Sequence, residues 1–270
     1  MEHASAVNIQ SSKQVSINVV SRGSGKPIIF MHGTAASARR WGKVADAFVA
    51  DRQVIEYDRR GRGKSTDADL YSLQNEIEDL HSILNHFGKG KAVDLVAHSY
   101  GALIALATLT KHSNSIDHLI LYEAPLSVTG QCEFIDIADV DEMEKILGHG
   151  GNEAATEFFL RRFPRVSEKE ITELKKSSIW QERVAAASTL GRELRAAFEY
   201  RIVEKGLGEL SLPCLILLGG ASPEPFQISA QYLHSLMPTS KLEVLTGERH
   251  RAMDTRPAVL VEVIEKFLQN

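Results

Sequence analysis

The chain has 270 residues, of which 24% are charged, and its formal net charge is −4. This length suits one large α/β domain, and no linker rich in Pro, Gly or Ser divides the sequence. The acidic balance argues against a surface that binds nucleic acid and against a basic membrane patch. The two cysteines, Cys132 and Cys214, lie far apart without metal-ligand spacing, so we expect neither a disulfide nor a zinc site.

The N-terminal residues Met-Glu-His-Ala-Ser-Ala lack the basic start and the apolar stretch of a signal peptide. No run of the sequence approaches the roughly 18 apolar residues that a membrane span needs. We therefore expect a cytoplasmic protein without a membrane or nucleic-acid partner. Whether it is a monomer or a homodimer stays open.

The first third of the chain alternates between strand and helix patterns. The apolar run Pro27–Met31 is typical of a strand buried on both faces of a parallel sheet. The elements expected around it are two short strands within residues 6–21 that flank Ser11-Ser12-Lys13, a helical stretch in Ser37–Ala50, a strand at Gln53–Tyr57, and a helix at Leu73–Phe87 that ends at Gly88.

The next stretch, Ala92–Thr110, joins a strand directly to a buried helix. The apolar run Val93–Ala97 breaks at His98-Ser99-Tyr100-Gly101, and an Ala- and Leu-rich segment follows without a polar face. A sharp turn there would push the Ser99 hydroxyl out of the sheet, with the amide of Tyr100 directed at the same space. This arrangement favours a nucleophilic serine with one oxyanion donor beside it.

The second half of the chain contains a long helical segment between strands. A strand at Ile116–Tyr122 ends at Glu123-Ala124-Pro125, and residues 126–208 then show helical periodicity only. The longest expected helix there is Glu182–Glu204, in which Gly191 suggests a close contact or a bend. A strand at Pro213–Leu218, a helix at Gln227–Met237, a strand at Lys241–Leu245 and an amphipathic helix through Phe267 complete the chain.

Four motifs, which follow one another along nearly the whole chain, together resemble those of the α/β-hydrolase superfamily. Ala97-His98-Ser99-Tyr100-Gly101 resembles its G-x-S-x-G nucleophile elbow, with Ala97 in place of the first glycine. The other three are His32-Gly33 after a buried strand, the D-x-x-G-x-G-x-S loop at Asp58–Ser65, and a G-x-x-H histidine, His250, after the last strand. The resemblance implies an α/β fold with a doubly wound, mostly parallel sheet. Residues 1–125 and 209–270 would form the core, and residues 126–208 a helical cap.

The resemblance also implies roles for individual residues. Ser99 would be the nucleophile, His250 the general base, and the amides of Thr34 and Tyr100 the oxyanion hole. As supporting residues, His32 and Gly33 would belong to the oxyanion loop, and His98 would pack or hydrogen-bond beside the nucleophile.

The acid of the triad is where the sequence departs from the family. The position that carries the usual Asp holds Ser222, which is neutral and cannot stabilise an imidazolium as a carboxylate does. We favour Glu123, 24 positions after Ser99 at the end of the next strand, with Ser222 as its hydrogen-bonding partner. Glu224 is the alternative acid, although Pro223 and Pro225 restrict it. A Ser-His dyad or an inactive site also stays open.

Basic residues gather in two parts of the sequence. The loop Asp58–Ser65 has three Arg and one Lys but lacks the spacing of a phosphate-binding loop, so we expect it to be structural. The helical segment carries further arginines that favour a solvated helix face, while contact with an anionic substrate stays open: Arg161, Arg162, Arg165, Arg183, Arg192, Arg195 and Arg201.

These features predict a cofactor-independent serine hydrolase without a metal, which cleaves a small ester, thioester or lactone through an acyl-enzyme. Ser99 excludes the chemistry of haloalkane dehalogenases and epoxide hydrolases, whose nucleophile is Asp. Hydroxynitrile lyases and cofactor-free oxygenases of this fold keep Ser and His, so they remain alternatives. A ligand-sensing protein that retains the pocket is a further alternative.

Overall fold

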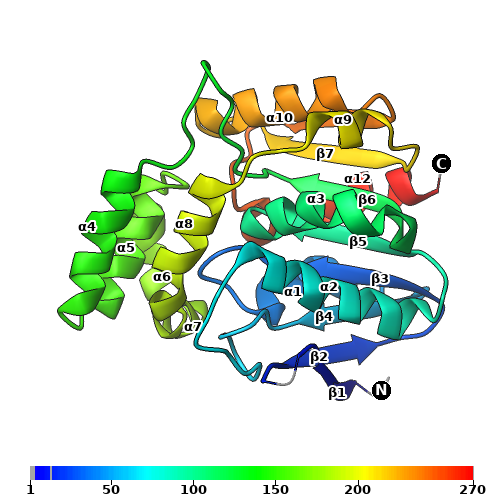
Figure 1. Cartoon of the computed structure of the whole chain (residues 1–270), viewed down its shortest axis with the longest axis horizontal. Coiled ribbons are helices and arrows are strands. Elements are labelled where there is room, and N and C mark those ends of the chain that lie inside the picture. The colour runs from blue at the N-terminus through cyan, green and yellow to red at the C-terminus, as the bar shows by residue number, and fades with distance from the viewer. Residues whose placement is uncertain (1–3, 13, 270) are drawn as a thin grey trace.

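The computed structural model describes residues 4–12 and 14–269, which form one eight-stranded sheet with helices on both faces (Figure 1). The strand order is β1-β2-β4-β3-β5-β6-β7-β8. The strands are β1 (Ser5–Gln10), β2 (Ser16–Arg22), β3 (Lys26–Met31), β4 (Arg52–Tyr57), β5 (Val93–His98), β6 (Ile116–Tyr122), β7 (Cys214–Gly219) and β8 (Ser240–Leu245). β2 pairs antiparallel with both β1 and β4, and β3 to β8 form the parallel part of the sheet. The predicted doubly wound, mostly parallel α/β fold is confirmed. The turn expected at Ser11-Ser12-Lys13 lies between β1 and β2, with Lys13 outside the described residues.

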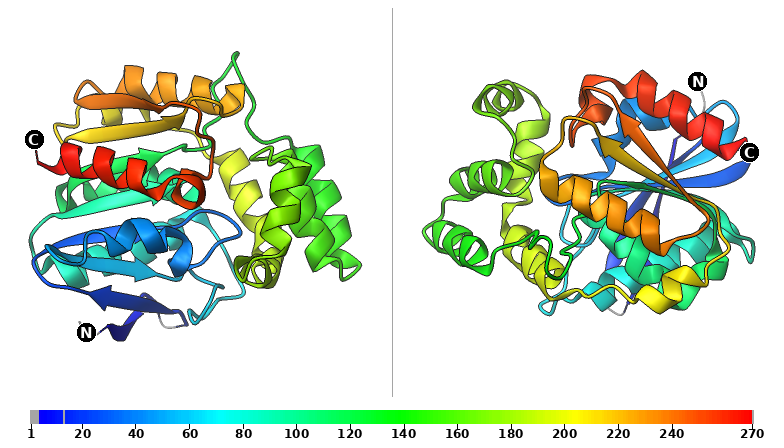
Figure 2. Two further views of the ribbon diagram at one scale, coloured as in Figure 1. Left: turned by 180° about the vertical axis from the view of Figure 1, so that it is seen from behind. Right: turned by 90° about the horizontal axis from the view of Figure 1, so that it is seen from above.

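Alternating side chains of the central strands pack into two separate hydrophobic cores, one on each face of the sheet. Ile29 and Met31 of β3 point to the face covered by α2 (Leu73–Gly88), α3 (Tyr100–His112), α9 (Glu204–Gly208) and α10 (Glu224–Leu236). Ile28 and Phe30 point to the opposite face, which α1 (Gly42–Asp46) and α12 (Pro257–Leu268) cover (Figure 2). Burial on both faces explains why these strands read as continuous apolar runs. No helix of the described residues is long and apolar enough to cross a membrane.

Five helices between β6 and β7 form a separate layer beyond one end of the sheet (Figures 1 and 2). We call them the insert helices: α4 (Ile137–Gly148), α5 (Asn152–Arg162), α6 (Glu168–Lys175), α7 (Ile179–Ala185) and α8 (Leu190–Glu199). They fall within residues 126–208, the segment expected to be a cap. The division of the chain into a core and a cap domain stays a prediction.

The single long helix expected at Glu182–Glu204 is wrong. α7 ends at Ala185, a 3₁₀ turn covers Ala187–Thr189, and α8 ends at Glu199 before an extended Tyr200. The break turns Thr189 inward, where its hydroxyl oxygen accepts a hydrogen bond from Arg62 at 2.6 Å. This tertiary contact leaves no periodic signal in the sequence. The close contact expected at Gly191 is present, because a β-carbon there would lie 2.4 Å from Glu144 Oε1 of α4.

Candidate active site

Ser99 occupies a sharp turn between β5 and α3. Its φ of 56° and ψ of −125° are unusual for a residue other than glycine, and such strained backbones cluster at functional sites. The turn is fixed on both sides, because the Ser99 amide donates to Tyr122 O at 2.9 Å and Ala102 N donates to Ser99 O at 2.8 Å. The result is a rigid elbow that presents the hydroxyl at the carboxyl end of β5.

Two glycines allow the backbone to pass close to this elbow. A β-carbon on Gly33 would lie 2.8 Å from Ser99 Cβ, and one on Gly101 would lie 2.6 Å from His32 O. Both distances are shorter than real β-carbon contacts, so a side chain at either position would push the oxyanion loop away from the elbow. Ala97, which replaces the first glycine of the motif, is fully buried.

The expected oxyanion donors, the amides of Thr34 and Tyr100, belong to the two segments that meet at Ser99. Tyr100 is the first residue of α3, so its amide has no acceptor within the helix. Thr34 and Tyr100 both line a cavity with Ser99, and neither amide has a hydrogen-bond partner among the described residues. Both amides are therefore available to a carbonyl oxygen in that cavity.

His32 holds the oxyanion loop in place. Its Nε2 accepts a hydrogen bond from Arg59 N at 3.1 Å, which leaves Nδ1 to donate to Gly33 O at 2.8 Å. Burial, reinforced by nearby arginines, lowers the pKa of His32 well below its usual value. His32 is thus a neutral structural residue, in line with the supporting position expected for it.

The structure brings His250 and Glu123 together. His250 Nδ1 lies 2.6 Å from Glu123 Oε2, and Glu123 is only 2% exposed to solvent. Glu123 follows β6, the neighbour of β5 in the sheet, and it has a φ of 51°. The ring of Phe226 stacks on the His250 imidazole with 4.6 Å between ring centres. The imidazole is therefore held by a carboxylate at one nitrogen and by an aromatic face.

The second carboxylate oxygen of Glu123 is also fully engaged. Oε1 accepts hydrogen bonds from Gly219 N at 2.8 Å and from Ser222 Oγ at 2.5 Å. Ser222, at the position expected to carry the family's usual Asp, therefore contributes a hydrogen bond that holds the Glu123 carboxylate in place. Glu224 is exposed at the start of α10, and no hydrogen bond joins it to His250 in the described structure.

Ser99 and His250 line the same two cavities, but no hydrogen bond joins their side chains among the described residues. Such bonds are often long without substrate and tighten in the reacting complex. His98 fixes the loop of His250, because His98 Nε2 donates to His250 O at 2.9 Å. Burial, followed by the charge of His250, lowers the pKa of His98 well below its usual value, so His98 stays neutral.

The two cavities at Ser99 differ in chemistry, and each has a volume of about 30 Å³. One is apolar and lies under the insert helices, with Phe134, Phe159, Phe163, Leu194 and Phe226 in its wall. The other has three arginines in its lining, Arg40, Arg183 and Arg251. A larger groove of about 790 Å³ lies along Gly61–Lys64 and contains neither Ser99 nor His250 in its lining.

The basic loop Asp58–Ser65 is structural, and its arginines are paired inside the protein. Arg59 Nη2 lies 2.6 Å from Glu76 and 2.5 Å from Glu193, and Arg62 Nη2 lies 2.5 Å from Glu193. Burial alone would raise the pKa of Glu193, but the two guanidiniums outweigh it and the pKa lies below its usual value. Since Glu193 belongs to α8, this buried ion cluster joins the insert helices to the core. The sequence gives no signal for it, because its carboxylates come from two distant helices.

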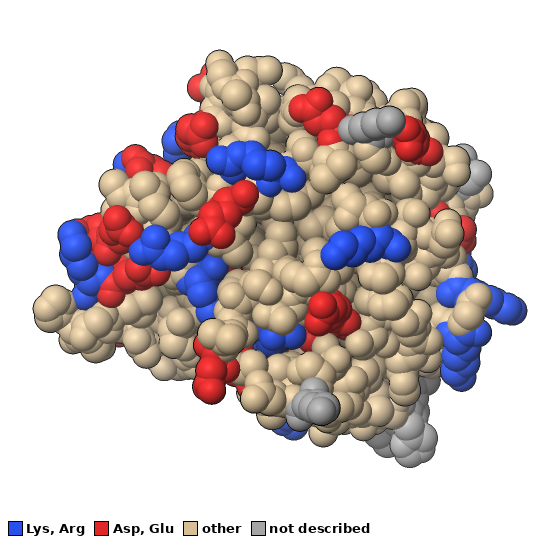
Figure 3. Space-filling model, in the orientation of Figure 1, with Lys and Arg blue, Asp and Glu red and all other residues tan. Residues whose placement is uncertain are grey.

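Most insert arginines make ion pairs on the surface, as a solvated helix face would. Arg161 pairs with Glu157 and Glu168, Arg162 with Asp139, and Arg195 with Asp141 and Glu144. Figure 3 shows the resulting mixture of basic and acidic side chains over the insert helices. Arg183 differs, since it is only 4% exposed and faces the cavity at Ser99.

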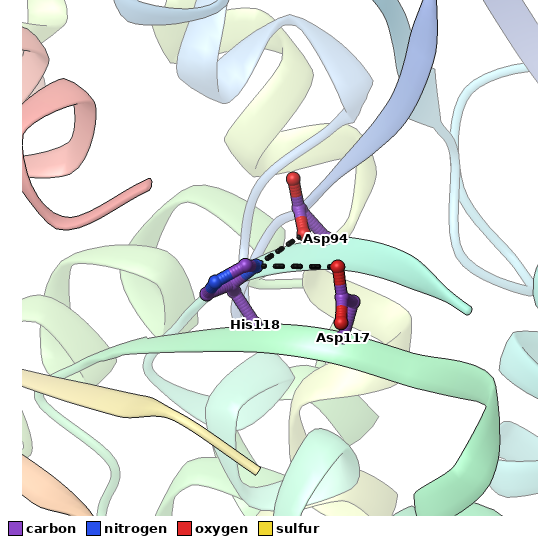
Figure 4. A group of neighbouring side chains, drawn as sticks. All are labelled: Asp94, Asp117 and His118. Carbon is purple, nitrogen blue, oxygen red and sulfur yellow. Dashed lines mark hydrogen bonds and ion pairs between the residues drawn. The ribbon is translucent and has the colours of Figure 1, made fainter. Parts of the chain in front are cut away.

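One group of side chains has the residue types of a metal site. Asp94, Asp117 and His118 lie together at the amino ends of β5 and β6 (Figure 4). The carboxylate of Asp94 already binds the Lys26 amine at 2.7 Å and the Arg52 guanidinium at 2.6 Å. These cations neutralise the group, so it is an ion-pair cluster at the end of the sheet opposite Ser99.

Comparisons with known proteins show which family the chain belongs to. The sequence matches the model of the Alpha/beta hydrolase family over residues 28–263. The non-heme chloroperoxidase CPO-A1 of Kitasatospora aureofaciens is 25% identical over 240 residues, which cover 84% of this chain and 86% of that protein. The (E)-2-((N-methylformamido)methylene)succinate hydrolase of Acinetobacter baylyi is 22% identical over 267 residues, 97% of each chain. A solved alpha/beta hydrolase of Sphaerobacter thermophilus superposes with a TM-score of 0.84 at 25% identity, covering 98% of this chain and 100% of that chain. The chain therefore belongs to the alpha/beta hydrolase family.

Proposed function

We propose that this protein is a cofactor-independent serine hydrolase that cleaves a small carboxylic ester, thioester or lactone. Membership of the alpha/beta hydrolase family supports hydrolysis in general. The proposal of a serine mechanism rests on one observation. The buried Glu123 carboxylate lies 2.6 Å from His250 Nδ1, beside a cavity that both His250 and Ser99 line. Hydroxyl, imidazole and carboxylate in this arrangement have the roles of a catalytic triad.

The carboxylate sets the tautomer of the imidazole. Because ionised Glu123 only accepts hydrogen bonds, neutral His250 carries its proton on Nδ1 and leaves Nε2 as the base. Nε2 takes the Ser99 proton as the Ser99 oxygen bonds to the acyl carbon. The amides of Thr34 and Tyr100 donate hydrogen bonds to the carbonyl oxygen, which becomes an oxyanion in the tetrahedral intermediate.

The intermediate collapses to an acyl-enzyme when His250 returns the proton to the leaving oxygen or sulfur. Water then loses a proton to His250 and attacks the acyl carbon. The acid is released and Ser99 recovers its proton. The apolar cavity under the insert helices suits a small aliphatic portion of the substrate.

Active-site labelling and ester turnover test the proposal. We expect a fluorophosphonate probe to label Ser99 and the enzyme to hydrolyse 4-nitrophenyl butyrate, and Ser99→Ala to abolish both. Ser82→Ala is the matched control, because its exposed hydroxyl only donates to Glu78 O. Folded protein that is neither labelled nor active on esters would contradict the proposal and favour ligand sensing. Labelled protein that cleaves a cyanohydrin but no ester would favour a lyase.

A further inference from the structure

Arg183 of α7 is a buried cation without a carboxylate partner among the described residues. One of its nitrogens, Nη1, donates to Ala35 O at 2.9 Å, whereas Nε is buried with no hydrogen-bond partner. A buried guanidinium with a free donor is costly, so a group that accepts that donor is expected nearby.

The carboxylates closest to Arg183 are used by other residues. Asp254 binds Arg40 and also Arg251, the latter at 2.9 Å. Glu182 accepts a hydrogen bond from Ser37 Oγ at 2.6 Å. The cavity wall therefore carries more positive than negative charge.

Arg183 keeps its charge in this environment. Burial, followed by the charges of Arg40 and Arg251, lowers the pKa of Arg183 to about 9. That value is above neutrality, so the guanidinium is still protonated at pH 7. The positive charge thus faces the cavity that contains Ser99 and His250.

We propose that Arg183, with Arg40 beside it, binds a free carboxylate of the substrate. The inference rests on the proposed serine hydrolase function and adds the substrate class: short esters, thioesters or lactones that carry a carboxylate. The planar guanidinium matches a carboxylate in geometry and charge. The cavity volume of about 30 Å³ suits a group of that size within reach of Ser99.

The neighbouring apolar cavity gives the substrate a defined orientation. Ser99 and His250 line both cavities, so the scissile carbonyl lies between a cationic wall and an aromatic wall. A substrate with a carboxylate at one end and an apolar portion at the other satisfies both walls. A neutral ester leaves Arg183 unpaired.

Two matched pairs of substrates test this inference. 4-Nitrophenyl hemisuccinate against 4-nitrophenyl butyrate places the carboxylate on the acyl side, and 4-acetoxybenzoate against phenyl acetate places it on the leaving group. We expect the carboxylate to raise kcat/KM at least 10-fold in one pair after correction for spontaneous hydrolysis. Arg183→Gln should reduce that ratio to about 1, and Arg183→Lys should keep part of it because the charge remains. Arg161→Gln, at an exposed paired arginine of α5, should leave the ratio unchanged.

Neutral esters that are hydrolysed without any preference for the carboxylated partner would overturn this inference alone, as would a preference that survives in Arg183→Gln. Absence of both ester turnover and Ser99 labelling would overturn the proposed function itself, and this inference with it. Should Arg183→Gln not fold, inhibition of the wild-type enzyme decides. We expect succinamate to inhibit at a concentration at least 10-fold below that of butyramide, or 4-hydroxybenzoate below phenol, and equal inhibition within both pairs would refute the inference.

Discussion

Replacement of Glu123 by Gln tests the most unusual feature of the site. Two donors, Gly219 N at 2.8 Å and Ser222 Oγ at 2.5 Å, would hold the amide oxygen of Gln where Oε1 now lies. The amide nitrogen would then face His250 Nδ1, which is 2.6 Å from the present carboxylate. Because that nitrogen is a donor, Nδ1 must become an acceptor and the proton moves to Nε2. His250 would then lack the free nitrogen that takes the Ser99 proton.

The expected loss is large. The same acid-to-amide change in a Ser-His-Asp triad lowers kcat by about 10⁴-fold with little change in geometry. Since each factor of ten corresponds to about 1.4 kcal/mol, this loss is about 5 kcal/mol of transition-state stabilisation. The assay is kcat for 4-nitrophenyl butyrate, with thermal unfolding as a measure of stability. Glu224→Gln is the matched control and should leave kcat within about twofold of wild type, because Glu224 is exposed. A stable Glu123→Gln variant within 10-fold of wild type, or a greater loss in Glu224→Gln, would refute this assignment of the acid.

Two further predictions concern stability. Glu193→Gln should lower the free energy of unfolding by about 3–5 kcal/mol, because it leaves buried Arg59 and Arg62 without their shared carboxylate; urea denaturation measures this, and an equal effect of Glu199→Gln, an exposed glutamate of the same helix, would contradict it. His98→Gln should make the free energy of unfolding fall less steeply as the pH decreases. The pKa of His98 is lower in the folded protein than in the unfolded chain, so the stability that neutral His98 contributes is complete above about pH 6.5 and is lost as the pH decreases. Between pH 7 and pH 5 this contribution is about 2 kcal/mol for one histidine, and parallel stability curves of wild type and variant would be inconsistent with a neutral His98.

Local patterns were sufficient to predict the sheet and the elbow. The apolar runs at β3 and β5 mark strands buried on both faces, and the change from Val93–Ala97 to an Ala-rich helix marks the turn at Ser99. Glu123 could be selected because residues that end neighbouring parallel strands meet at one edge of a sheet. The first of these inferences depends on sequence neighbours, and the second on a strand order that the resemblance to the α/β-hydrolase superfamily implied.

Contacts between segments far apart in the chain could not be predicted. Arg183 shares the helical periodicity of the exposed insert arginines, so only the packing of α7 against Ala35 shows that it is buried. The break before α8 likewise depends on the contact between Thr189 and Arg62. The amide of Gly219 binds Glu123 through the backbone, for which no side-chain pattern exists. In each case the partner lies more than 90 positions away.

The buried cluster of Arg59, Arg62, Glu76 and Glu193 holds α8 against the loop that follows β4. Lifting α8 from the sheet would separate these charges before water could solvate them, a barrier of several kcal/mol. The part of the insert around Phe134 and Phe163, which also covers the apolar cavity, has no such anchor in the described ion pairs. We therefore expect substrate to be admitted by a local displacement at this rim, with α8 held in place by the buried ion cluster.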